Sequence, residues 1–254
     1  MFRAYAVDLD EIGSLIADER VEYNYDNADE EKINSSLGNI LKADVNLLNG
    51  DELIECFFPS KCCHVFLCHS GLDKDRVKLF AQWLKDNFDI VSFIDSDLWG
   101  GVEQLKQEIE AGKKKTNDCF SYEISEHAHV MLCHALTKMI DYAECFVFLK
   151  SSNSSTSQQS SKKPGTFSPW IFYELLFFNK TKIMIPQKYK NFAKTACLSE
   201  ARENLKIEMP VQMQTLYSIS CTILDEWSNN YRKSRQDIMP IEMLYKILTT
   251  HIEE

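Results

Sequence analysis

Short apolar runs alternate with amphipathic segments along much of this chain. The run CCHVFLCH at 62–69 has the character of a strand that is buried on both faces in a parallel sheet. Apolar residues then recur at helical spacing through 73–88, which predicts an amphipathic helix. The same patterns predict strands at 90–94, 144–149, 181–185 and 205–209, and helices at 102–111, 129–141, 239–251 and from Ser168 onward.

This alternation of strands and helices is typical of a doubly wound parallel sheet with helices on both faces. We therefore predict an α/β, flavodoxin-like domain of about five parallel strands over residues 61–254. Residues 1–60 have a weaker pattern, with helical spacing only in 30–41, and are predicted to form a helical or mixed N-terminal extension. The Ser-, Gln- and Lys-rich segment 151–165 is predicted to be a mobile loop.

Polar and aromatic residues follow the first two predicted strands. In doubly wound sheets, ligands bind outside the carboxyl ends of the strands. The first strand ends at His69, Ser70 and Gly71, and the second leads into Asp95 and Trp99. We expect these five residues to line a substrate pocket, and the alternative is that they are ordinary loop and rim positions.

The segment SPWIFYEL (168–175) contains the most informative pair of side chains. Ser168 is a good N-cap and Pro169 suits the first helical position, so a helix is predicted to begin here. Trp170 and Glu174 are four residues apart and therefore share one face of that helix. An indole beside a carboxylate can hold a flat, cationic, sugar-linked ring. The alternative is a half-buried Trp and a solvated Glu.

Composition narrows the class of protein. With 44% hydrophobic and 26% charged residues, the 254-residue chain is ordinarily globular. Its formal net charge of -10 argues against non-specific binding to nucleic acid or to an anionic membrane. No signal peptide or membrane-spanning apolar run is visible, and the nine cysteines have no disulfide-scaffold spacing. We expect a cytoplasmic protein with reduced thiols.

A zinc site is a weaker alternative for the first predicted strand, which contains Cys62, Cys63, His64, Cys68 and His69. Strand alternation sends neighbouring side chains to opposite faces, and no second ligand pair stands at zinc-finger spacing. No Gly-rich phosphate loop is present either. We therefore predict neither a bound metal nor a cofactor.

Four segments together resemble a TIR domain: HVFLCHSGLDKD (64–75), IVSFIDSDLWGG (90–101), ALTKMIDYAECFVFLKS (135–151) and SPWIFYEL, which has the W-x-x-x-E of the enzymatic members. The resemblance covers about residues 62–235 and is greatest to bacterial antiphage TIR proteins of the Thoeris ThsB kind. Two features depart from the family. Trp99-Gly100-Gly101 replaces the Pro-Gly common in signalling adaptors, and residues 112–134 look inserted.

The resemblance implies that the chain cleaves the nicotinamide–ribose bond of NAD, which is then a substrate and not a cofactor. Glu174 would stabilise the transition state and bind the ribose, and Trp170 would stack on the nicotinamide. Backbone N–H groups of Ser70, Gly71 and Leu72 would hold the diphosphate. The product would be an ADP-ribose-derived signal for a downstream effector, and TIR surfaces would self-associate. The alternative is a non-catalytic interaction module that assembles with other TIR domains.

Overall fold

The computed structural model describes residues 3–17, 23, 49–99, 107, 118–156, 165–180, 209–211, 213, 216–234 and 238–253. The chain divides into two compact units. The first unit consists of Met1–Tyr23, Cys62–Ile94 and Ile140–Glu254, and the second of Asn24–Lys61 and Asp95–Met139.

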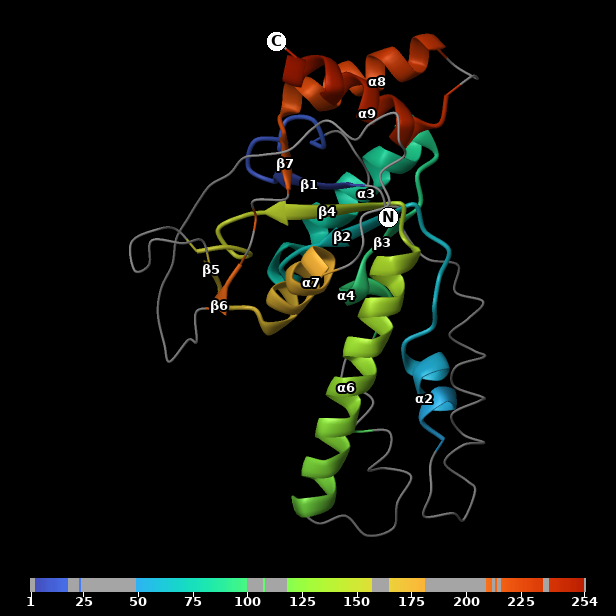
Figure 1. The fold of residues 1–254 in the computed structure, drawn as a ribbon, viewed down its shortest axis with the longest axis vertical. Helices are drawn as coiled ribbons and strands as arrows, with labels where there is room; N and C mark the ends of the chain where they lie inside the picture. The colour runs from blue at the N-terminus through green and yellow to red at the C-terminus, as the bar shows by residue number, and fades with distance from the viewer. Residues whose placement is uncertain are drawn as a thin grey trace. The chain divides into compact units, whose positions relative to one another are not determined.

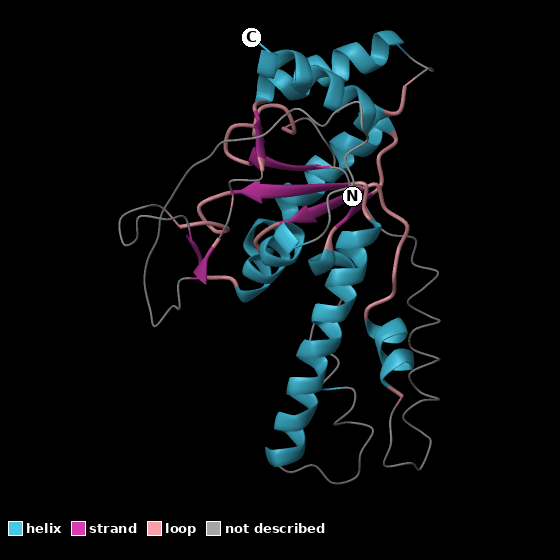
Figure 2. Ribbon diagram, in the orientation of Figure 1, coloured by secondary structure: helices cyan, strands magenta, loops and turns pink. Residues whose placement is uncertain are grey.

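Five parallel strands form the sheet of the first unit (Figures 1 and 2). Their spatial order is β3-β2-β4-β1-β7, and every neighbouring pair is parallel. The predicted α/β class with a five-stranded parallel sheet is thus confirmed, and the strand order is compatible with a flavodoxin-like fold. The strands are β1 (Arg3–Asp8), β2 (Val65–Cys68), β3 (Ser92–Phe93), β4 (Cys145–Lys150) and β7 (Tyr217–Ile219).

The N-terminal strand β1 is the main difference from the sequence-based interpretation, which placed residues 1–60 outside the main domain. β1 pairs with β4 along its whole length, from Arg3↔Cys145 to Asp8↔Lys150. Its other edge pairs with β7. The first residues of the chain are therefore part of the middle of the sheet, because both neighbouring strands use the backbone of β1.

The two remaining predicted strands have different outcomes. The strand predicted at 181–185 lies outside the described residues. The helix predicted within 30–41 also lies outside them, and of the helix predicted at 102–111 only residue 107 is described. Of the strand predicted at 205–209, only Met209 is described. It belongs to β6 (Met209–Pro210), which pairs antiparallel with β5 (Gly165–Thr166) in a separate two-stranded sheet. The expectation that this segment continues the parallel sheet is wrong for Met209. The strand at that edge of the parallel sheet is β7, next to β1.

One face of the sheet carries a row of aromatic side chains. Phe66 lies between Phe93 and Phe146, with ring centroids 5.4 and 5.6 Å away. Phe178 of helix α7 (Pro169–Lys180) stacks on Phe146 at 5.0 Å. Helix α7 therefore covers this face (Figure 1).

Helices α3 (Lys74–Phe88), α8 (Cys221–Ser234) and α9 (Pro240–Glu253) belong to the opposite side. Tyr5 of β1 lies 6.2 Å from Tyr245 of α9, measured between ring centroids. Trp227 of α8 stacks on Phe88 at the end of α3, at 3.8 Å. Burial of both faces explains why β2 and β4 read as continuous apolar runs.

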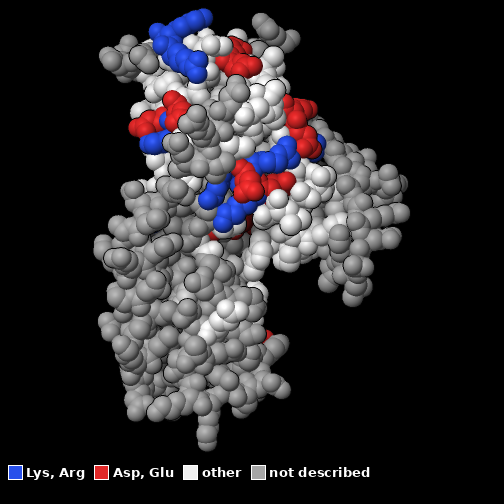
Figure 3. All heavy atoms as spheres, turned by 180° about the vertical axis from the view of Figure 1, so that it is seen from behind, with Lys and Arg blue, Asp and Glu red and all other residues white. Residues whose placement is uncertain are grey.

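The second unit contains α2 (Gly50–Phe57), α4 (Asp95–Leu98) and most of α6 (Asp118–Tyr142). Helix α6 includes the helix predicted at 129–141 and extends it toward the N-terminus through part of the predicted insertion at 112–134. The described buried residues of α6 follow helical spacing: Ile124, Ala128, Leu132, Ala135, Leu136, Met139 and Ile140. None of the helices described combines the length and apolar character that a membrane crossing demands. On the face seen in Figure 3, basic and acidic side chains of the described residues lie interspersed.

Candidate active site

The loops that follow β2 and β4 meet where a doubly wound sheet is expected to bind ligands. After β2 the chain continues to β3, which forms one edge of the sheet. After β4, which is on the other side of β2, the next described strand of this sheet is β7, at the opposite edge. Connections that leave two adjacent strands in opposite directions open a crevice at their carboxyl ends. The candidate site is therefore bounded by residues 69–73 and 151–156.

Asp73 joins these two loops. Its carboxylate accepts a 2.5 Å hydrogen bond from Ser151 Oγ and a 3.0 Å bond from Asn153 Nδ2. Arg76 Nη1 lies 3.9 Å from the same carboxylate. Asp73 as a whole is only 4% exposed. The residue pattern alone predicts no role for Asp73. Its position just after a buried strand, within the TIR-like segment 64–75, was the available signal.

A chain of hydrogen bonds continues from this junction to the start of α7. Ser154 N–H donates to Ser151 Oγ at 3.2 Å, and Thr166 Oγ1 donates to the Ser154 carbonyl at 2.9 Å. Ser168 N–H then donates to Thr166 Oγ1 at 3.1 Å. Ser168 Oγ accepts from Ile171 N–H at 3.3 Å, so the predicted N-cap is confirmed. The helix with Trp170 and Glu174 is thus attached to the loop that follows β4.

Glu174 lies on the buried stripe of α7. The buried residues of this helix are Ile171, Glu174, Leu175 and Phe178, at the 3–4–7 spacing of a face that packs against a sheet. Only 2% of Glu174 is exposed, so the alternative of a solvated glutamate is wrong. Trp170, one turn earlier, is half-buried. A carboxylate at a position where the helix otherwise uses apolar residues breaks the local pattern, as functional residues often do.

His69, Ser70 and Gly71 lie in the loop after β2. His69 is buried, and its Nδ1 lies 2.8 Å from the Leu67 carbonyl, which can only accept, so Nδ1 carries the proton. Ser70 Oγ accepts from Leu72 N–H at 3.4 Å, so this N–H, expected to bind phosphate, is already engaged. A Cβ added to Gly71 would meet nothing within 4 Å, so close packing does not require glycine there.

Asp95 and Trp99 belong to the second unit, whereas the residues above belong to the first. Trp99 is buried, its ring lies 5.4 Å from that of Phe58, and its Nε1 donates to the Pro59 carbonyl at 3.4 Å. Its contacts are those of a packing residue. Asp95 is half-buried at the start of α4.

Breaking the junction between the two loops is expected to destabilise the first unit. Asp73→Ala leaves the hydroxyl of Ser151 and the amide of Asn153 without their acceptor, and we expect a loss of about 1–3 kcal/mol in the free energy of unfolding. Urea denaturation measures this loss. The control is Asp75→Ala, which removes an exposed carboxylate from the first turn of α3, two residues after Asp73. Equal effects of the two substitutions would show that the junction contributes nothing.

The two adjacent cysteines before β2 differ in burial. Burial, reinforced by the neighbouring Cys62, raises the pKa of the Cys63 thiol to about 12, whereas Cys62 is exposed. Burial also raises the pKa of the Cys145 thiol. Within the described ranges, no group of three His, Cys, Asp or Glu side chains is placed to hold a metal ion.

We expect iodoacetamide at pH 8 to alkylate Cys62 well before Cys63. With its pKa raised to about 12, the Cys63 thiol at pH 8 is ionised in only about one molecule in ten thousand, and the thiolate is the reacting species. Tandem mass spectrometry of the peptide that contains both cysteines distinguishes the two sites. A Cys62→Ser variant isolates Cys63, and rapid alkylation of that variant would contradict the expectation.

Comparison of the chain with protein-family models, with curated proteins and with solved structures finds no match. The resemblance to TIR domains therefore rests on the four sequence segments and remains a prediction.

Proposed function

We propose that this chain is a TIR-type NAD glycohydrolase, ADP-ribosyl cyclase or ADP-ribosyl transferase that makes an ADP-ribose-derived signal in cytoplasmic antiphage defence. The observation that carries the proposal is the place of Glu174: a carboxylate with 2% exposure, on the buried stripe of a helix attached to the loop after β4. Burying a carboxylate is costly for the fold, which favours a functional reason for its presence.

The chemistry suits a single carboxylate. Nicotinamide is cationic while it is attached to ribose and leaves as a neutral molecule, so the leaving group needs no general acid. The ribose develops oxocarbenium character in the transition state, and a nearby carboxylate stabilises that charge. In this proposal Glu174 supplies the charge and binds the ribose hydroxyls. Trp170, four residues earlier on the same helix, stacks on the nicotinamide ring.

The loop after β2 would receive the rest of the substrate. The backbone N–H groups of Ser70 and Gly71 are proposed to contact the diphosphate, with Ser70 and His69 forming the wall of the pocket. Leu72 N–H is a weaker candidate because it already donates to Ser70 Oγ. Asp95 and Trp99 belong to the second unit, and no contact with the substrate is derived for them. The buried contacts of Trp99 favour a packing role.

The low exposure of Glu174 bears on when the enzyme is active. With 2% of this residue exposed, NAD reaches the carboxylate only after the side chains that cover it move. We therefore expect turnover to depend on self-association or on a trigger that opens the site. A downstream effector that senses the product would complete the signalling role.

An interaction module without turnover is the second candidate. Leu72, in the turn next to Ser70 and Gly71, is 83% exposed and is therefore available to contact another molecule. In this alternative, the loop would pack against another TIR domain.

Nicotinamide release from NAD distinguishes the two candidates. The purified full-length chain is incubated with NAD over a range of protein concentrations, nicotinamide is followed by chromatography, and the product mass is determined. Sedimentation velocity at the same concentrations reports assembly. Release that rises with assembly supports the enzyme. Assembly without release at any concentration, including in extract of phage-infected cells, supports the interaction module.

A further inference from the structure

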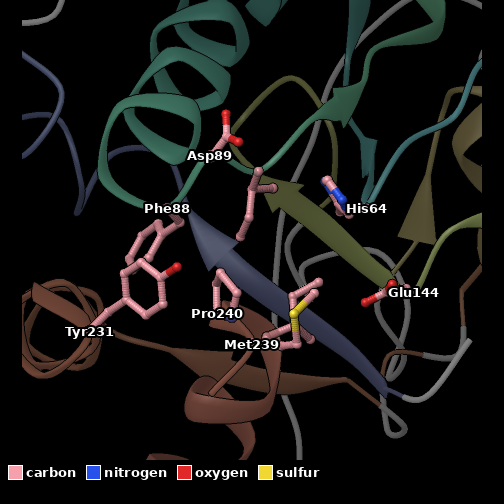
Figure 4. A pocket seen from close by; sticks show the side chains of 9 residues that line it. His64, Phe88, Asp89, Glu144, Tyr231, Met239 and Pro240 are labelled. Atoms are coloured by element: carbon pink, nitrogen blue, oxygen red, sulfur yellow. The ribbon is translucent and has the colours of Figure 1, made fainter. Parts of the chain in front are cut away.

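A cavity of about 220 Å³ lies at the end of the sheet opposite to the candidate active site (Figure 4). Two of its lining residues fix its position: His64 directly precedes β2, and Glu144 directly precedes β4. The cavity is therefore at the amino ends of these strands, whereas the residues of the proposed NAD site follow their carboxyl ends. All lining residues belong to the first unit.

Part of the lining is apolar and aromatic. Phe88, at the end of α3, and Tyr231, in the last turn of α8, have ring centroids 5.4 Å apart. Figure 4 shows these two rings on one side of the cavity, with Met239 and Pro240 nearby from the start of α9. Met239 is 60% exposed, so this wall also reaches the surface. The volume suits one ring with a short chain, being smaller than the roughly 300 Å³ at which pockets for drug-sized ligands begin.

The polar part of the lining is acidic. No described lining residue is a lysine or an arginine. Asp89 is paired with Lys85, which lies one turn earlier on α3, so its charge is already balanced. Glu144 is half-buried, and in the described part of the chain its carboxylate has no cation within ion-pair distance. Glu144 is therefore the charge that a ligand would neutralise.

His64 adds a hydrogen-bond donor. Its Nδ1 accepts a 2.9 Å hydrogen bond from Val91 N–H, so in the neutral ring the proton is on Nε2. Figure 4 shows His64 and Glu144 on the side of the cavity facing Phe88 and Tyr231. A carboxylate opposite two aromatic rings is a favourable environment for an amine carried on an apolar group, because the carboxylate attracts the positive charge and the rings pack against the apolar part.

We propose that this cavity binds a small organic cation, a protonated amine carried on a single apolar ring. The ammonium group pairs with Glu144, and the ring packs against Phe88, Tyr231 and Pro240. This site is separate from the proposed NAD site and does not depend on it, since none of its residues is shared.

The test compares three probes of similar shape by titration of the ¹⁵N-labelled full-length protein: phenethylamine as the cation, 2-phenylethanol as the neutral analogue and phenylacetate as the anion. We expect phenethylamine to bind at least about tenfold more tightly than 2-phenylethanol, the gain typical of a hydrogen bond to a charged group. Phenylacetate is expected to bind most weakly. The shifted amide resonances should be those of His64, Asp89 and Ile241, which line the cavity.

Glu144→Gln is the decisive variant, because it keeps the size of the side chain and removes its charge. Its affinity for phenethylamine should fall to the level of 2-phenylethanol, whose own binding should be unchanged. Glu126→Gln, at an exposed position of α6, should change neither. Equal binding of the amine and the alcohol to the wild type, unchanged amine binding in Glu144→Gln, or shifts confined to other residues would each overturn the proposal.

Discussion

A chain that begins at residue 61 is expected to be unable to form the first unit. Strand β1 occupies the fourth place in the sheet and is paired on both edges, so its removal exposes the backbone of β4 and β7. Tyr5, Val7 and Leu9 have exposures of 0%, 1% and 0%, and burying each such side chain contributes about 1.5–3 kcal/mol. Their loss is comparable with the ~5–15 kcal/mol by which a whole domain is stable.

Circular dichroism and thermal melting of the 61–254 fragment measure this effect. We expect an insoluble product or a soluble one without a cooperative transition. In the full-length chain, Val7→Asp should lower the melting temperature strongly, because it places a charge in the buried face of the sheet. Ala17→Asp, at an exposed position of the same N-terminal segment, serves as the matched control. A folded 61–254 fragment with a cooperative melt would contradict the central role of β1.

The sequence predicts well those elements whose signals are local. Strands β2 and β4 are continuous apolar runs because both of their faces are covered, and α3 has an apolar stripe that points to one side. The start of α7 follows from Ser168 and Pro169, and the observed hydrogen bond to Ser168 Oγ matches that expectation.

Strand β1 could not be placed in the sheet from its own residues. Two of its positions are Ala4 and Ala6, and charged residues lie at both ends, so its apolar signal is weak. What makes it a central strand is pairing with β4, about 140 positions later in the chain. Such long-range pairing overrides local propensity and leaves no trace in a single sequence.

Only those parts of the candidate site that depend on local spacing could be predicted from the sequence. The spacing of Trp170 and Glu174 places them on one helical face, and the apolar positions Ile171, Leu175 and Phe178 could have shown that Glu174 lies on the buried stripe. The hydrogen bond between Asp73 and Ser151 joins residues 78 positions apart and needed the structure. The buried packing of Trp99 needed it as well, since an aromatic residue in a polar loop is equally compatible with a pocket wall.

Glu174→Gln is expected to lower the rate of nicotinamide release by at least about 100-fold, the scale found when one preorganised electrostatic contact to a transition state is removed. Glutamine keeps the size of the side chain and its hydrogen-bonding oxygen but not the negative charge that stabilises an oxocarbenium-like ribose. Because the substitution is nearly isosteric at a buried position, the fold should be retained. A melting temperature within a few degrees of the wild type would verify this.

The most direct measurement is the initial rate of nicotinamide release by the wild type, Glu174→Gln and Glu55→Gln, at one saturating NAD concentration and at the same series of protein concentrations, so that each state of assembly is compared. Glu55 is an exposed glutamate of α2 and controls for the loss of a charge elsewhere. The account predicts release by the wild type and Glu55→Gln at similar rates and its near-complete loss in Glu174→Gln. Equal rates in all three proteins, or no release by the wild type in any state of assembly, would contradict it.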